Sequence, residues 1–272
     1  MRTRPNWPAG VLAGAWLLII LIPVYVMLRA AFESRETYAD KGPLGLPTEF
    51  TFANFAYAFE QGFGKFMANS VIVAVLTVAI VLVLVPPLAF AIVRSDSRTV
   101  RRVFKIMLFG LAIPAQVVVI PVMYLIQYIG LYDTLIGIAL PTAAFAIPMS
   151  TLILTGTMRE IRGELYEAMA MDGSGPVRTF LRLVLPLSRG GIATVIVFTA
   201  LNAWNNYLLP LVLTRSEDVR VATLGLGVFQ QQYSLNIPGL MSAILLTILP
   251  MLLIYLFARR ALIRGLMGVG GK

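Results

Sequence analysis

Six long stretches without a single charged side chain constrain this 272-residue chain more than any other feature. The stretches cover residues 5–28, 66–93, 106–132, 134–158, 190–214 and 221–258. Each exceeds the roughly 20 residues that an α-helix needs to cross about 30 Å of hydrocarbon. A soluble chain of this size could not bury six such segments, so the pattern predicts an all-α polytopic membrane protein.

The composition agrees with a membrane protein and removes several kinds of chemistry. Hydrophobic residues make up 58% of the chain and charged residues only 13%, against roughly 45–50% and 25% in soluble domains. Cysteine and histidine are both absent. Their absence excludes disulfides, thiolate nucleophiles, histidine bases and the commonest zinc sites. We therefore expect neither a catalytic set of that kind nor a metal site.

We expect six transmembrane helices and two long connections between them. The predicted spans are residues 9–31, 66–93, 106–126, 134–156, 190–213 and 239–258. The two long connections are residues 32–65 and 157–189. This organisation divides the chain into an N-terminal span with its outer loop (1–65), a core (66–262) and a short C-terminal tail (263–272).

The distribution of lysine and arginine predicts the orientation of the chain in the membrane. If the N-terminus lies in the cytoplasm and the spans alternate, the inner segments hold 16 basic residues and the outer segments hold six. Because an excess of Lys and Arg in short loops marks the cytoplasmic side, both termini are expected there, in a cytoplasmic (inner) membrane. The net charge of +9 is then explained by topology, and no nucleic-acid partner is expected.

The cytoplasmic connection 157–189 has the pattern of two short helices. Glu160, Glu164 and Glu167 are spaced to share one helix face, beside an apolar stripe. Asp172-Gly173 is expected to end the first helix, because glycine tolerates a left-handed backbone. Gly175-Pro176 is expected to start the second. From periodicity alone, an amphipathic hairpin on the membrane surface and a protein-docking element fit equally well.

The same connection resembles the EAA motif of ABC-importer permeases. In that family Glu-Ala-Ala is followed at fixed spacing by Gly, Ile and Leu-Pro. The matching residues here are Glu167, Ala168, Met169, Gly173, Leu183, Leu185 and Pro186. Met for the second Ala and Leu for Ile are apolar replacements, and the segment precedes the second-last span, as in the family.

The resemblance extends over nearly the whole chain, to the smaller permease subunit of sugar importers of the maltose-transporter type. The similar stretches are Asn54-Phe55, Asn69-Ser70, 130–135, 204–211 and the glycine-bearing tail 265–272. A shorter likeness places Gln230, Gln231, Gln232 and Tyr233 in an outer loop that reaches the binding protein. The resemblance implies the type I ABC-importer transmembrane fold, with 157–189 as a coupling loop.

Such a subunit implies several partners. They are a homologous permease that completes a heterodimeric pore, two cytoplasmic ATPase subunits and an extracytoplasmic solute-binding protein, all beside membrane lipid. The chain contains no G-x-x-x-x-G-K-[S/T] phosphate loop. We therefore expect no cofactor on this chain, no enzymatic activity of its own, and ATP and Mg²⁺ on the partner ATPase.

Neutral polar residues within the spans are candidates for the solute path. Asn202, Asn205 and Asn206 cluster in the fifth predicted span, and Gln116 and Gln127 bracket the third. Hydrogen bonding between helices explains any one of them equally well. On a continuous helix, Asn202 and Asn206 would share a face, and that face is expected to line the path.

Three functions fit the features of the sequence to different extents. An importer permease for a sugar or oligosaccharide accounts for the spans, the charge bias and the missing ATP site together. A secondary transporter or channel accounts only for the spans, and the charge-free runs hold no intramembrane ion or proton site. An intramembrane enzyme would have to use Ser, Thr or Tyr alone.

Overall fold

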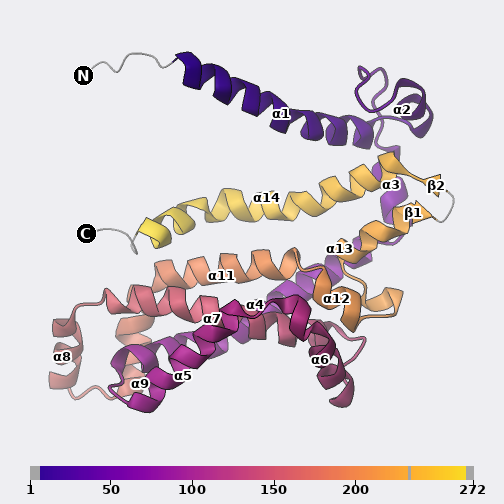
Figure 1. Ribbon diagram of the computed structural model, residues 1–272. Coiled ribbons are helices and arrows are strands. Elements are labelled where there is room, and N and C mark those ends of the chain that lie inside the picture. The colour runs from indigo at the N-terminus through magenta and orange to yellow at the C-terminus, as the bar shows by residue number, and fades with distance from the viewer. Residues whose placement is uncertain (1–6, 232–233, 268–272) are drawn as a thin grey trace. The chain divides into compact units, whose positions relative to one another are not determined.

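The computed structural model describes residues 7–231 and 234–267, with side chains for 7–229 and 236–256. The described chain is helical apart from a minimal hairpin (Figure 1), which confirms the predicted all-α membrane class. The longer elements are α1 (Trp7–Phe32), α4 (Phe63–Arg94), α5 (Arg98–Phe109), α6 (Ala115–Tyr128), α7 (Leu135–Arg159), α11 (Arg189–Trp204) and α14 (Ile237–Met267). The hairpin pairs β1 (Gln230–Gln231) with β2 (Ser234–Leu235).

Short helical elements connect these helices. Before α4 lie α2 (Arg35–Lys41) and α3 (Ala53–Glu60), and η1 (Gly110–Ala112) follows α5. Between α7 and α11 lie α8 (Gly163–Met171), α9 (Pro176–Thr179), η2 (Phe180–Val184) and α10 (Leu185–Leu187). After α11 come α12 (Leu208–Leu213), η3 (Glu217–Val219), α13 (Ala222–Gly225) and η4 (Leu226–Phe229).

The chain divides into two compact units. The first comprises residues up to Gly64 together with Gly225–Pro250, and the second comprises Lys65–Leu224 with the residues from Met251 onward. The first unit is held by a buried amide: Asn54 Nδ2 donates to the carbonyl oxygens of Ala31 and Glu33 at 3.0 and 2.8 Å. Ser242 Oγ donates to the backbone oxygen of Asn54 at 3.0 Å, which ties α14 to α3.

A buried ion pair lies at the C-terminal end of α1, in the first unit. Arg29 and Glu33 lie 2.7 Å apart one helical turn from each other, and both side chains are almost completely buried. The Arg29 guanidinium also donates to the backbone oxygen of Gly42 at 2.6 Å and lies 5.7 Å from the Tyr38 ring centroid. Breaking one partner of a buried pair leaves an uncompensated charge, so this pair fixes the turn from α1 into α2.

The second unit is built around α4, α7 and α11. Fully buried Val81, Val85 and Ala89 of α4 pack with Leu154 of α7 and Val195 of α11. Gly191 allows the close approach of α11 to α7, because a Cβ there would lie 2.5 Å from Thr157 Oγ1. In Figure 1, α8 and α9 lie at one end of α7 and α12 lies at the other end.

The connection between α6 and α7 is fixed by one carboxylate. Asp133 Oδ1 accepts hydrogen bonds from the backbone N–H groups of Arg215 and Ser216 at 2.9 and 3.0 Å. The bond from Arg215 is the largest cause that lowers the pKa of Asp133 below its usual value, against the opposing effect of burial. Gly130 and Asp133 have φ of 74° and 59°. These bonds tie the stretch 130–135 to the backbone at Arg215 and Ser216.

Four helices are long and apolar enough to cross a membrane without interruption: Trp7–Phe32, Phe63–Arg94, Leu135–Arg159 and Ile237–Leu256. Two further pairs qualify only as bent pairs, Arg98–Ala112 with Ala115–Tyr128 (108°) and Pro176–Leu187 with Arg189–Trp204 (75°). The described chain thus has six spans if each bent pair counts as one. The third predicted span, 106–126, is divided between two helices that meet at a break.

Local backbone chemistry favours a break at this point of the third span. Ile113 is extended, as residues before proline prefer. Pro114 is the N-cap of α6 and has no N–H that could continue the preceding helix.

The fifth predicted span, 190–213, was too long. The helix α11 ends at Trp204, and a separate helix α12 begins at Leu208.

Candidate solute path and coupling segment

A polar cavity of about 700 Å³ opens where α6, α7 and the end of α11 meet. Its lining residues are Ala115, Gln116, Thr142, Phe145, Ala146, Phe198, Leu201, Asn202, Asn205, Asn206, Tyr207 and Leu208. The cavity therefore collects all three asparagines that the sequence singled out, together with Gln116. Gln127 does not line it. Thr142 and Tyr207 are polar lining residues that sequence reasoning missed, because a lone threonine or tyrosine in a span carries no pattern.

All three asparagines of the cavity lie at or just after the end of α11. Their spacing of i, i+3 and i+4 places them within about 100° of one another around a helix, since successive residues turn by about 100°. The helix stops at Trp204, and Asn205 is its C-terminal cap. Asn206 leaves the helical path, and its Oδ1 accepts a hydrogen bond from the Leu209 N–H at 3.2 Å, at the start of α12.

The three asparagine side chains in the cavity differ in the hydrogen bonds that they make. Asn202 and Asn205 are exposed, and each donates its Nδ2 to a carbonyl of its own helix, at 2.8 and 2.9 Å. Among the residues that the structure describes, neither side-chain oxygen accepts a hydrogen bond. Asn206 also donates to Thr142 Oγ1 at 3.3 Å. Asn202 and Asn205 can thus accept hydrogen bonds from solute hydroxyls, while Asn206 supports the site.

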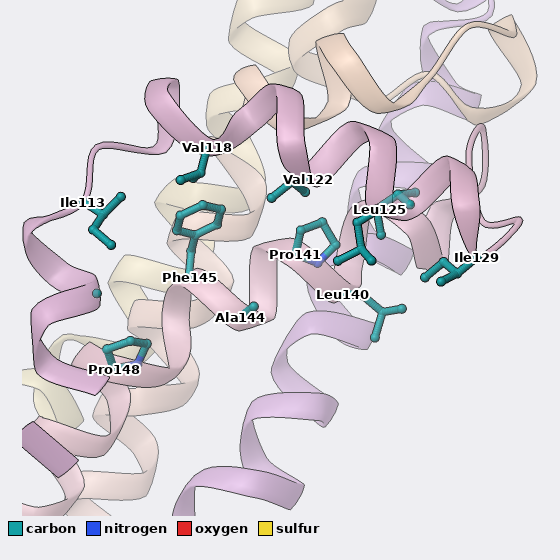
Figure 2. A pocket seen from close by; sticks show the side chains of 12 residues that line it. Ile113, Val118, Val122, Leu125, Ile129, Leu140, Pro141, Ala144, Phe145 and Pro148 are labelled. Atoms are coloured by element: carbon teal, nitrogen blue, oxygen red, sulfur yellow. The ribbon is translucent and has the colours of Figure 1, made fainter. Parts of the chain in front are cut away.

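A second cavity, of about 470 Å³, lies between α6 and α7 and is almost wholly apolar (Figure 2). Side chains of Val118, Val122 and Leu125 approach it from α6, and Pro141 and Phe145 from α7. Phe145 lines both cavities. Since the apolar cavity offers no hydrogen-bonding side chain, only the polar one suits a hydroxyl-rich solute.

The first short helix of the connection 157–189 ends as the sequence predicts. Gly173 has φ of 69°, in the left-handed region. Its N–H donates to the Ala170 oxygen at 3.0 Å, and the Ser174 N–H donates to the Met169 oxygen at 2.9 Å. These two bonds form a Schellman motif, which satisfies carbonyls that the helix end would otherwise leave unpaired. The predicted glycine stop is confirmed.

The predicted face of three glutamates was partly wrong. Glu160 caps α7, whereas Glu164 and Glu167 lie on α8, so Glu160 belongs to a different helix. The helix α9 begins with Pro176 in its first turn, as predicted. In α9 and the turn η2 that follows it, Val177 is 71% exposed and Val184 is fully buried.

The residues of the EAA-like pattern differ in their exposure to solvent. Glu167, Ala168 and Gly173 are exposed, and Met169, Leu183, Leu185 and Pro186 are half-buried. The last three lie in or directly after the π-helical turn η2. Pro186 accounts for that turn, because it has no N–H to donate to the carbonyl four residues earlier.

Tyr166 anchors the segment to the bundle, and sequence reasoning missed it. Its ring is buried on the inner side of α8, packed with the cluster of α4, α7 and Val184. The Arg94 guanidinium, at the end of α4, lies 4.4 Å from the ring centroid, within cation–π range. Burial raises the pKa of the Tyr166 phenol, and the Arg94 charge opposes that effect. An isolated tyrosine in a short helix gave no signal of this role.

Opposite Tyr166 the segment exposes an apolar surface. Met171 is 89% exposed and Leu181 is 54% exposed. A hollow of about 520 Å³ is lined by Gly175, Pro176, Val177, Arg178, Leu181 and Arg182. We name Ala168, Met171, Val177 and Leu181 the outer face of the connection. Several exposed apolar side chains in one short segment are typical of a binding surface.

The residues proposed to meet a binding protein lie partly outside the described chain. Gln230 and Gln231 form strand β1, paired with β2. Gln232 and Tyr233 lie outside the described residues.

Within the described chain no group of three or more Asp, Glu, His or Cys could hold a metal ion.

Within the second unit, a polar cavity between apolar helices and an exposed segment of short helices at one end of α7 have the architecture of a transport permease. The family of binding-protein-dependent transport system inner membrane components matches residues 87–268. A putative ABC transporter permease of Caldicellulosiruptor sp. is 34% identical, over 93% of this chain and 92% of its own. The chain therefore belongs to this family of ABC-importer permeases.

Two further similarities support the family and the fold. The diacetylchitobiose uptake permease NgcG of Streptomyces coelicolor is 33% identical, over 90% of this chain and 82% of its own. A bacterial ABC transporter involved in alginate import has a chain that superposes with a TM-score of 0.83 at 21% identity. This superposition covers 96% of our chain and 99% of the other, and it shows the fold alone.

Proposed function

We propose that this permease forms one half of the pore of a sugar or oligosaccharide importer. The observation that carries the proposal is the polar cavity, in which Asn202 and Asn205 present carbonyl oxygens at a break between helices. Hydroxyl-rich solutes exchange water for such acceptors with little loss of hydrogen bonding. The relation to a diacetylchitobiose permease supports the same class of solute.

The proposed complex has several other components. A homologous permease completes the pore, a solute-binding protein delivers the sugar outside, and two ATPase subunits bind ATP and Mg²⁺ in the cytoplasm. Both chain termini are proposed to lie in the cytoplasm, which the basic excess of the inner segments supports. The segment Gln230–Tyr233 is proposed to contact the binding protein.

The connection 157–189 is proposed to couple the ATPase to the pore. Its outer face would enter a groove of the ATPase, next to Glu167, while Tyr166 holds the segment to the ends of α4 and α7. Movement of the ATPase would then reach the spans through packed contacts. The Schellman motif at Gly173 keeps the two short helices at a fixed angle.

Replacing the two exposed asparagines by leucine tests the proposed solute path. We expect Asn202→Leu and Asn205→Leu to lower solute uptake at least about ten-fold together, because each removes from the cavity an accessible hydrogen-bond acceptor and adds apolar bulk. Transport of labelled sugar into membrane vesicles is the measurement. Gln127→Leu, an exposed amide on α6 outside the cavity, is the matched control and should transport normally.

Assembly is measured in the same preparations. Copurification with the partner permease should be unchanged in the Asn202→Leu and Asn205→Leu variants, since both amides otherwise bond only to their own helix. Loss of the partner permease from these variants would contradict the path and show that the amides join helices. Normal uptake in the double variant would contradict it as well.

A further inference from the structure

The helix α5 carries four basic side chains on one face. Arg98, Arg101, Arg102 and Lys105 follow the spacing i, i+3, i+4, i+7, so they form a single stripe along two turns. All four are exposed, and together they line a hollow of about 200 Å³. We call this surface the basic stripe.

The basic stripe has no acidic partner in the described part of the chain. None of the four side chains takes part in an ion pair among residues 7–229 and 236–256. Arg101 donates one hydrogen bond, at 3.0 Å, to the backbone oxygen of Asp96 and not to its carboxylate. Four neighbouring cations without counter-charge repel one another, so the stripe is suited to an anionic partner.

An exposed apolar flank lies beside and beyond the stripe. Val103 and Ile106 are 51% and 69% exposed, and Phe109, one turn after Lys105 on the same face, is 72% exposed. Ile113, just after the helix, is 50% exposed and also lines the apolar cavity of Figure 2. The exposed surface therefore changes from basic to apolar along the axis of the helix.

The remaining side of α5 faces the protein. Val100, Phe104, Met107 and Leu108 are half-buried, and α5 packs against α7. The helix thus has a protein-facing side, a cationic side and an exposed apolar flank. A membrane boundary offers headgroup phosphates to the stripe and acyl chains to the flank at once.

The dimensions agree with a position at the membrane boundary. At 1.5 Å per residue, the stripe extends about 10 Å along the helix. The interfacial layer of one leaflet is roughly 5–8 Å thick, and Lys and Arg side chains reach several ångströms beyond their backbone. The charge-free run that begins at Ile106 then enters the hydrocarbon.

We propose that α5 is a binding site for anionic phospholipid. Arg98, Arg101, Arg102 and Lys105 bind headgroup phosphates, and Ile106 and Phe109 lie among the acyl chains. The lipid holds α5 at the boundary, ahead of the break at 110–114, while α6 beyond the break carries Gln116 to the polar cavity. Lipid binding at this site depends neither on the proposed solute nor on the ATPase.

Retention of labelled lipid on the immobilised permease complex tests the site. Complex purified in detergent is loaded with phosphatidylglycerol or with phosphatidylcholine of the same acyl chains, then washed. We expect the wild type to prefer phosphatidylglycerol and Arg101→Gln/Arg102→Gln to lower that preference roughly 25-fold, since each cation near an anionic surface contributes about five-fold. Arg101→Lys/Arg102→Lys should keep most of it.

The matched control is Arg159→Gln/Arg162→Gln, which removes two exposed charges from the same predicted side of the membrane and should retain the wild-type preference. Equal retention of both lipids by the wild type would overturn the proposal, and so would an equal loss in the control. A glutamine variant that kept phosphatidylglycerol but lost the ATPase would assign the stripe to a protein contact.

Salt gives a test on the wild type alone, should the glutamine variant fail to assemble. Raising ionic strength from 0.1 to 1 M shortens the screening length from about 10 to 3 Å. The preference for phosphatidylglycerol should then fall several-fold. A preference that persisted at 1 M salt would contradict binding through the basic stripe.

Discussion

Replacing Gly173 by valine should abolish solute uptake while the chain still inserts and pairs with its partner permease. The φ of 69° at this residue is left-handed, a region that costs β-branched residues more than the roughly 1 kcal/mol typical of glycine-to-alanine changes. No atom lies within 4 Å of a Cβ built there, so the backbone alone carries the penalty. The Schellman motif would open, and α8 would tilt away from the ATPase.

The control for this variant is Gly163→Val, at the start of the same helix. Gly163 also has no neighbour within 4 Å of an added Cβ, but its φ is not positive. Uptake should therefore survive there. ATPase retention in washed membranes is measured beside uptake. If Gly173→Val kept both, the connection would be an amphipathic hairpin on the membrane surface and not a coupling element.

Ala168→Trp tests the same coupling without backbone strain. Ala168 is exposed on the isolated chain, so a large side chain has room there and folding should be unaffected. In an ATPase groove the indole would collide with the partner, whereas Ala168→Ser would be tolerated. Loss of bound ATPase with Trp but not with Ser is the expected result.

The second large effect concerns Tyr166. Tyr166→Ala should uncouple ATP hydrolysis from uptake, because it removes the buried ring that attaches α8 to α4 and α7 and the ring's contact with Arg94. Aromatic-to-alanine changes in packed cores cost about 3–5 kcal/mol. The ATPase should stay bound and hydrolyse ATP, but uptake should fall to background.

Tyr166→Phe is the matched control for this change. The Tyr166 hydroxyl is buried without a hydrogen-bond partner among the described residues. Because removing an unsatisfied buried polar group is neutral or stabilising, the phenylalanine variant should transport at least as well as the wild type. An equal defect in the Phe and Ala variants would contradict the packing role and indicate a function of the hydroxyl.

Features that depend on local chemistry could be predicted from the sequence. Charge-free runs reveal membrane spans because no other environment tolerates them at that length. The stop at Gly173 and the start at Pro176 follow from backbone preferences that tertiary packing does not alter. The asparagine cluster could be recognised as polar groups in an apolar run, although the cavity that unites it could not.

Features that depend on long-range packing could not be predicted. Pro114 lies at the break of the third span, but prolines also occur inside α4, α6, α7 and α14 without breaking them. Composition does not distinguish the two outcomes, since neighbouring helices decide whether the freed carbonyls are satisfied. The end of α11 at Trp204 and the burial of Tyr166 likewise depend on residues far away in sequence.

Uptake by the copurified complex in proteoliposomes distinguishes an ATP-driven importer from a channel or secondary transporter. ATP is supplied on the side of the ATPase, and the binding protein with labelled sugar on the other side. We expect accumulation against the sugar gradient that requires both ATP and the binding protein and is lost with Gly173→Val. Sugar that only equilibrated without ATP, or that followed an imposed proton gradient, would contradict it and indicate a channel or a secondary transporter.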